Sequence, residues 1–138
     1  MKKFEYIDIS TADVAFIAYG KDLNELFSNS ALAMYGIMVE IDKIEEKIEK
    51  ELIVEGYDLE SLMFNWLNEL LYITDTEKLV FKNFDIKIDE KNFKLFAKCK
   101  GEEISEKHNP KTVVKAATYH LMKIQKNDIW KAQVILDI

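Results

Sequence analysis

The sequence predicts an α+β fold with two layers, in which two main helices cover a mixed, mostly antiparallel sheet of about seven strands. Two stretches, near residues 23–36 and 59–73, carry apolar residues at helical spacing, whereas several shorter stretches alternate apolar and polar residues as strands do. The composition is 49% hydrophobic and 32% charged, with one proline and four glycines, which leaves little room for disorder or long loops. A length of 138 residues is typical of one domain, here residues 1–138.

The first strand is predicted at residues 4–9 and the second, apolar on both faces, at residues 14–19. A helix follows from Leu23 to near Gly36, and Asp22 with Glu25 resembles the capping box that begins a helix. Residues 41–56 fit both a helical and a strand pattern. Because the charged residues occupy odd positions and the apolar ones even positions, we favour a strand there.

The clearest element is the helix that begins after Asp58. Asp58 can accept hydrogen bonds from the free N–H groups of the first turn, Glu60 adds negative charge near the positive end of the helix dipole, and residues 74–76 end the pattern. Burial of its apolar face would contribute on the order of 10–15 kcal/mol of gross driving force. The apolar face comprises Leu59, Leu62, Met63, Trp66, Leu67, Leu70, Leu71 and Ile73, and we also expect Tyr72 to be a core residue rather than a stacking platform.

The second half of the chain predicts more strands than helices. Residues 84–88 and 93–99 alternate around a polar turn and form a hairpin. Asn109 before Pro110 resembles a helix start, so we expect a short helix at 111–117. Two further strands complete the set, at 118–125 and 130–136.

Composition narrows the classes of function. The net charge is −6 and the chain has no arginine, so direct binding to a nucleic-acid backbone is not expected, and a metal, a basic protein or a neutral substrate is a better partner. A single cysteine, Cys99, excludes an internal disulfide and is typical of a reducing, cytoplasmic environment. Because the residues after Met1 do not form an apolar run and no stretch reaches the length of a membrane span, we expect neither a secretory leader nor a membrane-spanning segment.

Familiar catalytic patterns are missing from the chain. His108 and His120 lack the spacing of a zinc site, and His108 is expected to be a turn residue beside Pro110. The four glycines are isolated, so there is no glycine-rich phosphate loop, and no Gly-x-Ser-x-Gly elbow occurs. Cys99 alternates with apolar residues and is interpreted as a core residue.

Three polar residues interrupt segments that otherwise look buried: Asp13, Lys115 and Asp137. Asp137 lies next to the α-carboxylate of Ile138, and two adjacent negative groups are relieved when they coordinate a hard cation such as calcium or magnesium. If Asp13 approaches from a neighbouring strand, three anionic ligands result. The alternative is that these carboxylates are simply solvated, as most at strand ends are.

Lys115 and His120 also allow two interpretations each. Lys115 either lies on the surface of a short helix with its stem along apolar neighbours, or presents its charge to a phosphate or carboxylate of a partner. His120 is structural, or it joins the aspartates in a metal-dependent hydrolase.

Four motifs, in order along the chain, resemble the archease family. They are Thr11-Ala12-Asp13 followed by Ala18-Tyr19-Gly20, the run from Trp66 to Leu71, the run from Lys115 to His120, and the closing Ile135-Leu136-Asp137-Ile138. The resemblance implies a small acidic protein that is not an enzyme and that activates the RtcB-type RNA ligase of tRNA splicing and RNA repair. It would promote transfer of GMP from GTP to the ligase and so allow multiple turnovers. A chaperone-like role toward a tRNA methyltransferase is the alternative for the family.

The resemblance also implies roles for single residues. Asp13, Lys115 and Asp137 match the positions needed for ligase activation, and Asp13, Asp137 and the terminal Ile138 match a divalent metal site. One departure concerns Ser10, where the family usually has histidine, which leaves the finer mechanism open but not the role of the aspartates.

Overall fold

The computed structural model describes residues 1–8 and 13–138, which form seven strands, two α-helices and two 3₁₀ helices. The strands belong to two separate sheets, which we call sheet A, in the order β1-β2-β7-β6, and sheet B, in the order β3-β5-β4. The elements in chain order are β1 (Phe4–Asp8), β2 (Asp13–Gly20), α1 (Leu23–Met38), η1 (Ile41–Lys43), β3 (Ile48–Glu55), α2 (Leu59–Glu77), β4 (Leu79–Asp89), β5 (Lys94–Glu103), η2 (Glu106–His108), β6 (Ala116–Lys126) and β7 (Trp130–Asp137).

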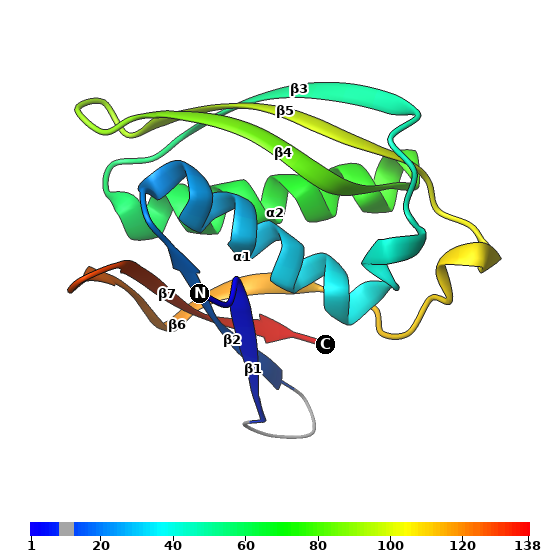
Figure 1. Ribbon diagram of the computed structural model, residues 1–138, viewed down its shortest axis with the longest axis horizontal. Coiled ribbons are helices and arrows are strands. Elements are labelled where there is room, and N and C mark those ends of the chain that lie inside the picture. Colours follow the sequence, from blue (N-terminus) through cyan, green and yellow to red (C-terminus); the bar gives the residue numbers. More distant parts are fainter. Residues whose placement is uncertain (9–12) are drawn as a thin grey trace.

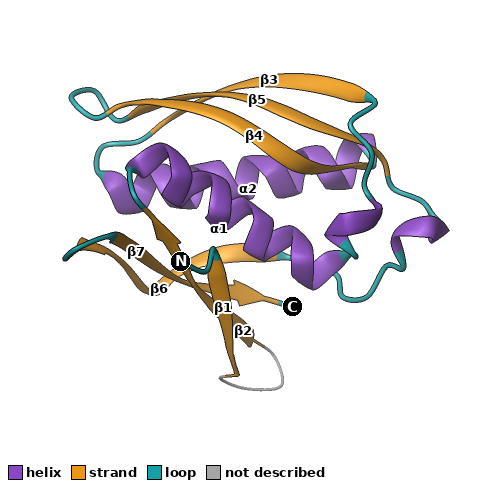
Figure 2. Ribbon diagram, in the orientation of Figure 1, coloured by secondary structure: helices purple, strands orange, loops and turns teal. Residues whose placement is uncertain are grey.

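Both helices lie between the two sheets, with sheet B above them and sheet A below them (Figures 1 and 2). The predicted α+β class, the strand number and the two helices are confirmed, but the single mixed sheet in two layers is wrong. Every strand pair is antiparallel, and the layers are three. A helical connection between two strands of the same sheet usually makes those strands parallel. Here the helical connection from β2 to β3 passes from sheet A to sheet B, so no parallel pair results.

The middle position of the helices follows from the width of their apolar faces. The Trp66 side chain on α2 is fully buried and donates from Nε1 to the Phe27 carbonyl of α1 at 3.0 Å. Tyr35 on α1 is also fully buried, bonds Thr74 of α2 at 2.8 Å, and packs edge-on against Phe81 of β4. Helices that are buried on two sides cannot cover one sheet only.

The predicted starts of the two main helices are confirmed. Asp58 accepts from the Ser61 N–H at 2.7 Å, and the Ser61 hydroxyl accepts in return from the Asp58 N–H at 3.1 Å, which makes a reciprocal capping box. Asp22 accepts from the Glu25 N–H at 2.8 Å. The α2 helix continues past its expected end to Glu77. Thr74, although polar, is buried on the inner face of the helix, because its hydroxyl is hydrogen-bonded to the Tyr35 hydroxyl.

The predicted short helix at 111–117 is wrong. Asn109 has a left-handed backbone (φ 48°) and ends the 3₁₀ turn η2, so it does not have the extended conformation of a residue that starts a helix. The N–H groups of Lys111 and Lys115 instead donate to the carbonyls of Met38 and Asp137, at 2.8 Å each. These bonds tie an irregular segment, residues 109–115, to α1 and β7. In the ambiguous 41–56 stretch the predicted strand is confirmed only from residue 48 on.

Asparagine side chains on the helices satisfy backbone groups at the edges of the sheets. Asn24 accepts from Ile88 N–H of β4 at 3.1 Å, and Asn65 donates to the Glu55 carbonyl of β3 at 2.7 Å. Strand edges with unpaired groups can pair with other chains, so these bonds also protect the protein against edge-to-edge association.

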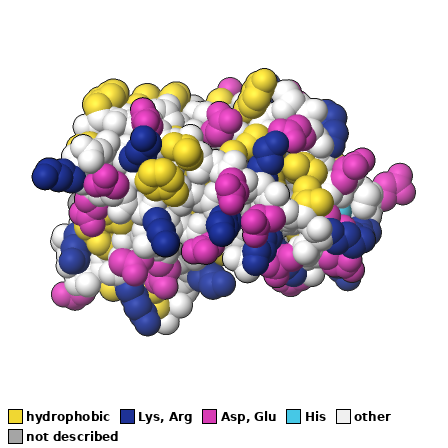
Figure 3. All heavy atoms as spheres, turned by 90° about the horizontal axis from the view of Figure 1, so that it is seen from above, with side chains coloured by type: hydrophobic (Ala, Val, Ile, Leu, Met, Phe, Trp, Pro, Cys, Tyr) yellow, Lys and Arg dark blue, Asp and Glu magenta, His cyan; other side chains and the backbone are white. Residues whose placement is uncertain are grey.

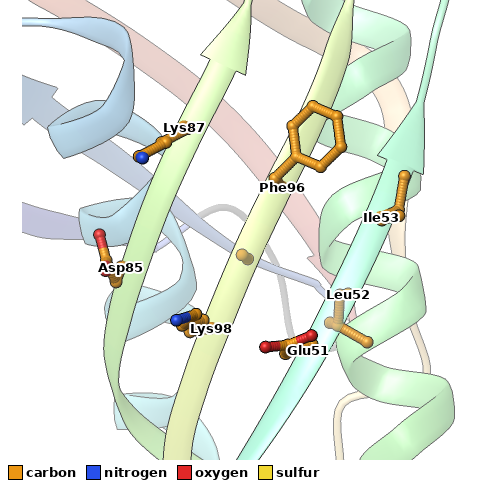
Figure 4. Close-up of a pocket in the computed structure, with 8 residues that line it drawn as sticks. Glu51, Leu52, Ile53, Asp85, Lys87, Phe96 and Lys98 are labelled. Carbon is orange, nitrogen blue, oxygen red and sulfur yellow. The ribbon is translucent and has the colours of Figure 1, made fainter.

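The outer face of sheet B is a solvated, mixed-charge surface (Figure 3). Lys98 of β5 lies between Glu51 of β3 and Asp85 of β4, and Ile53 lies beside Phe96, around a hollow of about 250 Å³ (Figure 4). Opposite charges across neighbouring strands explain this arrangement as ordinary sheet pairing. No helix in the described parts of the chain has the length and apolar character needed to cross a membrane.

Candidate functional site

Asp13 and Asp137 lie directly opposite each other at one end of sheet A. Asp13 is the first residue of β2, Asp137 is the last of β7, and the antiparallel register pairs them. Opposed residues in an antiparallel pair direct their side chains to the same side of the sheet. Leu136, the neighbour of Asp137, is buried in the core between the sheets, so the two carboxylates lie on the outer side of sheet A. Both residues are half-buried.

This pair has the donor chemistry of a hard-cation site. Within residues 1–8 and 13–138, no three His, Cys, Asp or Glu side chains are grouped so as to hold a metal ion. A metal ion on this pair would need a further ligand, and the carboxylate of Ile138 adjoins Asp137 in the chain. Carboxylate oxygens are the ligands that calcium and magnesium prefer, so this donor set fits either ion.

Lys115 adjoins the carboxylate pair through the backbone. Its N–H donates to the Asp137 carbonyl at 2.8 Å, and the next residue, Ala116, pairs with Asp137 in the β6–β7 ladder. Lys115 is exposed. It lies in the irregular segment before β6 and not on a short helix, which corrects that interpretation. The fold thus brings together the three residues that the sequence singled out from positions 13, 115 and 137.

Asn68 of α2 holds the beginning of β6 and was missed by the sequence analysis. Its side chain accepts from the Ala117 N–H at 2.9 Å and donates to the Ala117 carbonyl at 3.2 Å, as a neighbouring strand would. Ala117 follows Lys115 by two residues. A polar residue between Leu67 and Leu70 of a strongly apolar helix was the signal that could have identified Asn68.

Replacing Asn68 by leucine is expected to loosen the start of β6. Both backbone groups of Ala117 lose a partner, at a cost of about 1–2 kcal/mol in the free energy of unfolding, and the Ala117 amide should exchange faster with solvent. The matched control is Asn65→Leu, which removes one bond to β3 of the other sheet. Amide exchange measured by NMR distinguishes the two, and unchanged protection of Ala117 in Asn68→Leu would contradict the assignment.

The structure describes His120 but not Ser10. His120 is exposed and lies where the β6–β7 register shifts, between Thr118 and Lys123. It is four residues from Ala116, roughly 13 Å along an extended strand. The register therefore does not support a hydrolase centre of Asp13, Asp137 and His120. Ser10 lies outside the described residues.

His108 is not only a turn residue. It is fully buried, its Nδ1 accepts from the Ser105 N–H at 2.9 Å, and its Nε2 therefore donates to Glu102 at 3.0 Å. Glu102 also accepts from Lys107 Nζ at 2.8 Å and from the Glu45 N–H at 2.7 Å. Burial raises the pKa of Glu102, but the bonds from Lys107, Glu45 N–H and His108 outweigh it and lower the pKa to about 2.

The Glu102–His108 cluster joins β5 to the segment before β3. Glu102 belongs to sheet B, whereas the carboxylate pair belongs to sheet A. The role of the cluster is structural.

The Cys99 side chain is buried in the core as predicted, and burial raises the pKa of its thiol to about 12, so it is not a nucleophile. The prediction that Tyr72 is a core residue is wrong, because its side chain on α2 is 63% exposed.

Comparison with known proteins gives one consistent result. Residues 4–138 match the model of the Archease protein family (MTH1598/TM1083). The protein archease of Pyrococcus abyssi is 48% identical over 143 residues and that of Methanothermobacter thermautotrophicus 45% over 141 residues, each covering 100% of both chains.

Two solved structures share the fold. The solution structure of Methanobacterium thermoautotrophicum protein 1598 has a TM-score of 0.87 and 45% identity over 100% of both chains. The crystal structure of an archease, possible chaperone, from Thermotoga maritima has a TM-score of 0.66 and 23% identity over 94% of this chain and 93% of that one. The second supports the fold alone.

Proposed function

The chain belongs to the archease family, and from this premise we propose that it is a non-enzymatic cofactor protein of an RtcB-type RNA ligase. It promotes the GTP-dependent guanylylation of the ligase and thereby its multiple turnover in tRNA splicing and RNA repair. The protein supplies charged groups to the active site of the ligase and carries out no bond-making step itself.

The observation that carries this proposal is the register of Asp13 against Asp137. Two residues 124 positions apart are placed side by side at one sheet end, on the side turned away from the core. Carboxylate oxygens are the donors that hard cations prefer. Two of them on opposed residues at an accessible sheet end can contribute ligands to a cation and meet a charged partner.

Asp13, Asp137 and the terminal carboxylate of Ile138 would hold the divalent ion, calcium or magnesium. When bound, the ion supplies positive charge that stabilises triphosphate oxygens during guanylyl transfer. The residues of this chain position it. The Asp13–Asp137 register fixes the two carboxylates, and the Lys115 N–H fixes the backbone of Asp137.

Lys115 contributes a second positive charge. Its side chain is exposed and its backbone N–H bonds the Asp137 carbonyl, and its ammonium group can neutralise a phosphate of the nucleotide. Because the chain has no arginine, lysine is its only permanent side-chain cation for this task.

The test is guanylylation of the cognate ligase with labelled GTP under multiple-turnover conditions, with substoichiometric amounts of this protein. Wild type should raise the turnover, whereas Asp137→Ala should lose about tenfold to a hundredfold of the stimulation. Asp128→Ala is the control, because it removes an exposed carboxylate from the turn at the other end of the β6–β7 hairpin. Calorimetric titration with calcium, and then with magnesium, should show weaker binding to Asp137→Ala than to Asp128→Ala.

Full stimulation by Asp137→Ala would remove the basis of the proposal. If wild type has no effect on an active cognate ligase, the alternative to test is a chaperone-like action on a tRNA methyltransferase, measured as a change in the sites that the enzyme methylates.

A further inference from the structure

Large apolar side chains are exposed along the open side of α2. Tyr72 of α2 is 63% exposed, Ile53 of β3 is 65% exposed, and Val113 of the irregular segment 109–115 is 76% exposed. Single exposed apolar residues are common on protein surfaces, but several that line one continuous depression are typical of an interaction site.

These residues do line one depression. A hollow of about 420 Å³ between β3 and α2 is bordered by Ile53 and Tyr72, and one of about 430 Å³ between α2 and the segment 109–115 is bordered by Tyr72 and Val113. A third, of about 300 Å³, shares Val113 and Leu71 with the second and continues to Met38. Because neighbouring hollows share residues, they form one surface, which we call the α2 groove.

The α2 groove has a lysine-rich side. Lys78, Lys111 and Lys115 border its second and third hollows, where Asp75 is the acidic side chain, whereas Glu55 and Glu69 border the first hollow. The first two ammonium groups are held at the rim, since Lys78 donates to the Asp75 carbonyl at 2.7 Å and Lys111 to the Gly36 carbonyl at 2.9 Å. On a chain with a net charge of −6, three lysines around an apolar hollow favour a ligand that combines apolar and acidic groups.

The groove is continuous with the carboxylate pair. Lys115 borders the second hollow and donates its N–H to the Asp137 carbonyl. Asn68 borders the first two hollows and holds Ala117 at the beginning of β6. The carboxylate pair and the α2 groove are therefore linked through one short segment, residues 115–117.

We propose that the α2 groove is the docking surface for the ligase named above, an inference that rests on the proposed function. A segment of the ligase places an apolar side chain between Tyr72 and Val113 and directs carboxylates toward Lys78 and Lys111. The carboxylate pair then acts on the guanylylation site, while the groove provides affinity. Binding and activation are thus assigned to different residues.

The test measures affinity and activation separately, on the full chain and the cognate ligase. Calorimetry should show roughly tenfold or greater loss of affinity for Val113→Glu and for Tyr72→Ser, and a smaller loss for Lys111→Glu. The matched control is Leu121→Glu, which places the same charge at an exposed apolar position of β6 that borders none of the three hollows and should change affinity less than about twofold. Asp137→Ala should retain affinity and lose stimulation.

Each outcome decides between the proposals. If Val113→Glu and Tyr72→Ser bind as wild type while Asp137→Ala fails to stimulate, the docking surface is wrong and the proposed function stands. If wild type neither binds nor stimulates the ligase, both are overturned. If sedimentation shows that wild type forms dimers that Val113→Glu abolishes, with ligase affinity unchanged, the groove is an interface between copies and the docking proposal is overturned. Thermal unfolding confirms that each variant is folded, and Tyr72→Ser is the variant that decides if Val113→Glu is not.

Discussion

Replacing Gly101 by alanine is expected to lower the free energy of unfolding by about 3 kcal/mol or more. A Cβ on Gly101 of β5 would overlap the Val80 carbonyl oxygen of β4 and lie 2.7 Å from the Phe81 Cα. Both are backbone atoms in a paired strand, and the β4–β5 register shifts here between Phe81 and Asn83. The clash can be relieved only by separating the two strands, and sheet B has only three.

Urea unfolding followed by circular dichroism measures this change, and Gly36→Ala is its control. A Cβ on Gly36 would meet the end of the Tyr6 side chain, which can rotate away, and alanine gains about 0.5–1 kcal/mol over glycine inside a helix. Gly36→Ala should therefore remain within about 1 kcal/mol of wild type, as the lost Tyr6–Ala33 hydrogen bond offsets the gain. Equal stability of Gly101→Ala and wild type would mean that β4 and β5 are not so closely paired.

Replacing Glu102 by glutamine is expected to destabilise the protein by about 2–3 kcal/mol at pH 7. Glu102 is 6% exposed, and its carboxylate is the acceptor for Lys107, for the Glu45 N–H and for the fully buried His108. An amide carries no charge for Lys107 and presents N–H donors to a site that is filled with donors.

The pH dependence has a defined sign. The Glu102 pKa is lowered in the folded state, from 4.5 to about 2, so its contribution to stability is present above pH 4.5 and is lost as the pH falls toward 2. The stability difference between wild type and Glu102→Gln should therefore shrink over that interval. Glu103→Gln, at the exposed neighbouring position, should show neither effect. Urea unfolding at pH 7 and pH 3 gives the comparison, and a difference that does not depend on pH would contradict this account.

Local structure was largely predictable from the sequence, and the predictions that were wrong have identifiable physical causes. Caps at Asp22 and Asp58 act between residues three positions apart, so the sequence contains the whole interaction. The short helix expected after Asn109 failed because the Lys111 and Lys115 N–H groups found acceptors on α1 and β7. Such distant partners leave no mark on the local pattern.

The candidate site shows the same division. Asp13 and Asp137 could be identified because each is a polar residue in an apolar strand. That the strand of Asp13 lies next to the strand of Asp137 could only be suggested. Asn68 was missed because its role is a hydrogen-bond pair with Ala117, 49 residues away. His108 was taken as a turn residue because nothing near it in sequence indicates full burial against Glu102.

The sequence by itself determined the helices, the approximate strands, the acidic character and the two aspartates, since periodicity, caps and charge are properties of neighbouring residues. The division into two sheets, the helix layer between them, the α2 groove and the approach of Asp13, Lys115 and Asp137 were decided by the tertiary structure. The physical reason is that alternation along a strand shows which side chains are buried but not which strand lies beside it. Pairing is chosen by packing over the whole core, and here that packing placed both helices inside.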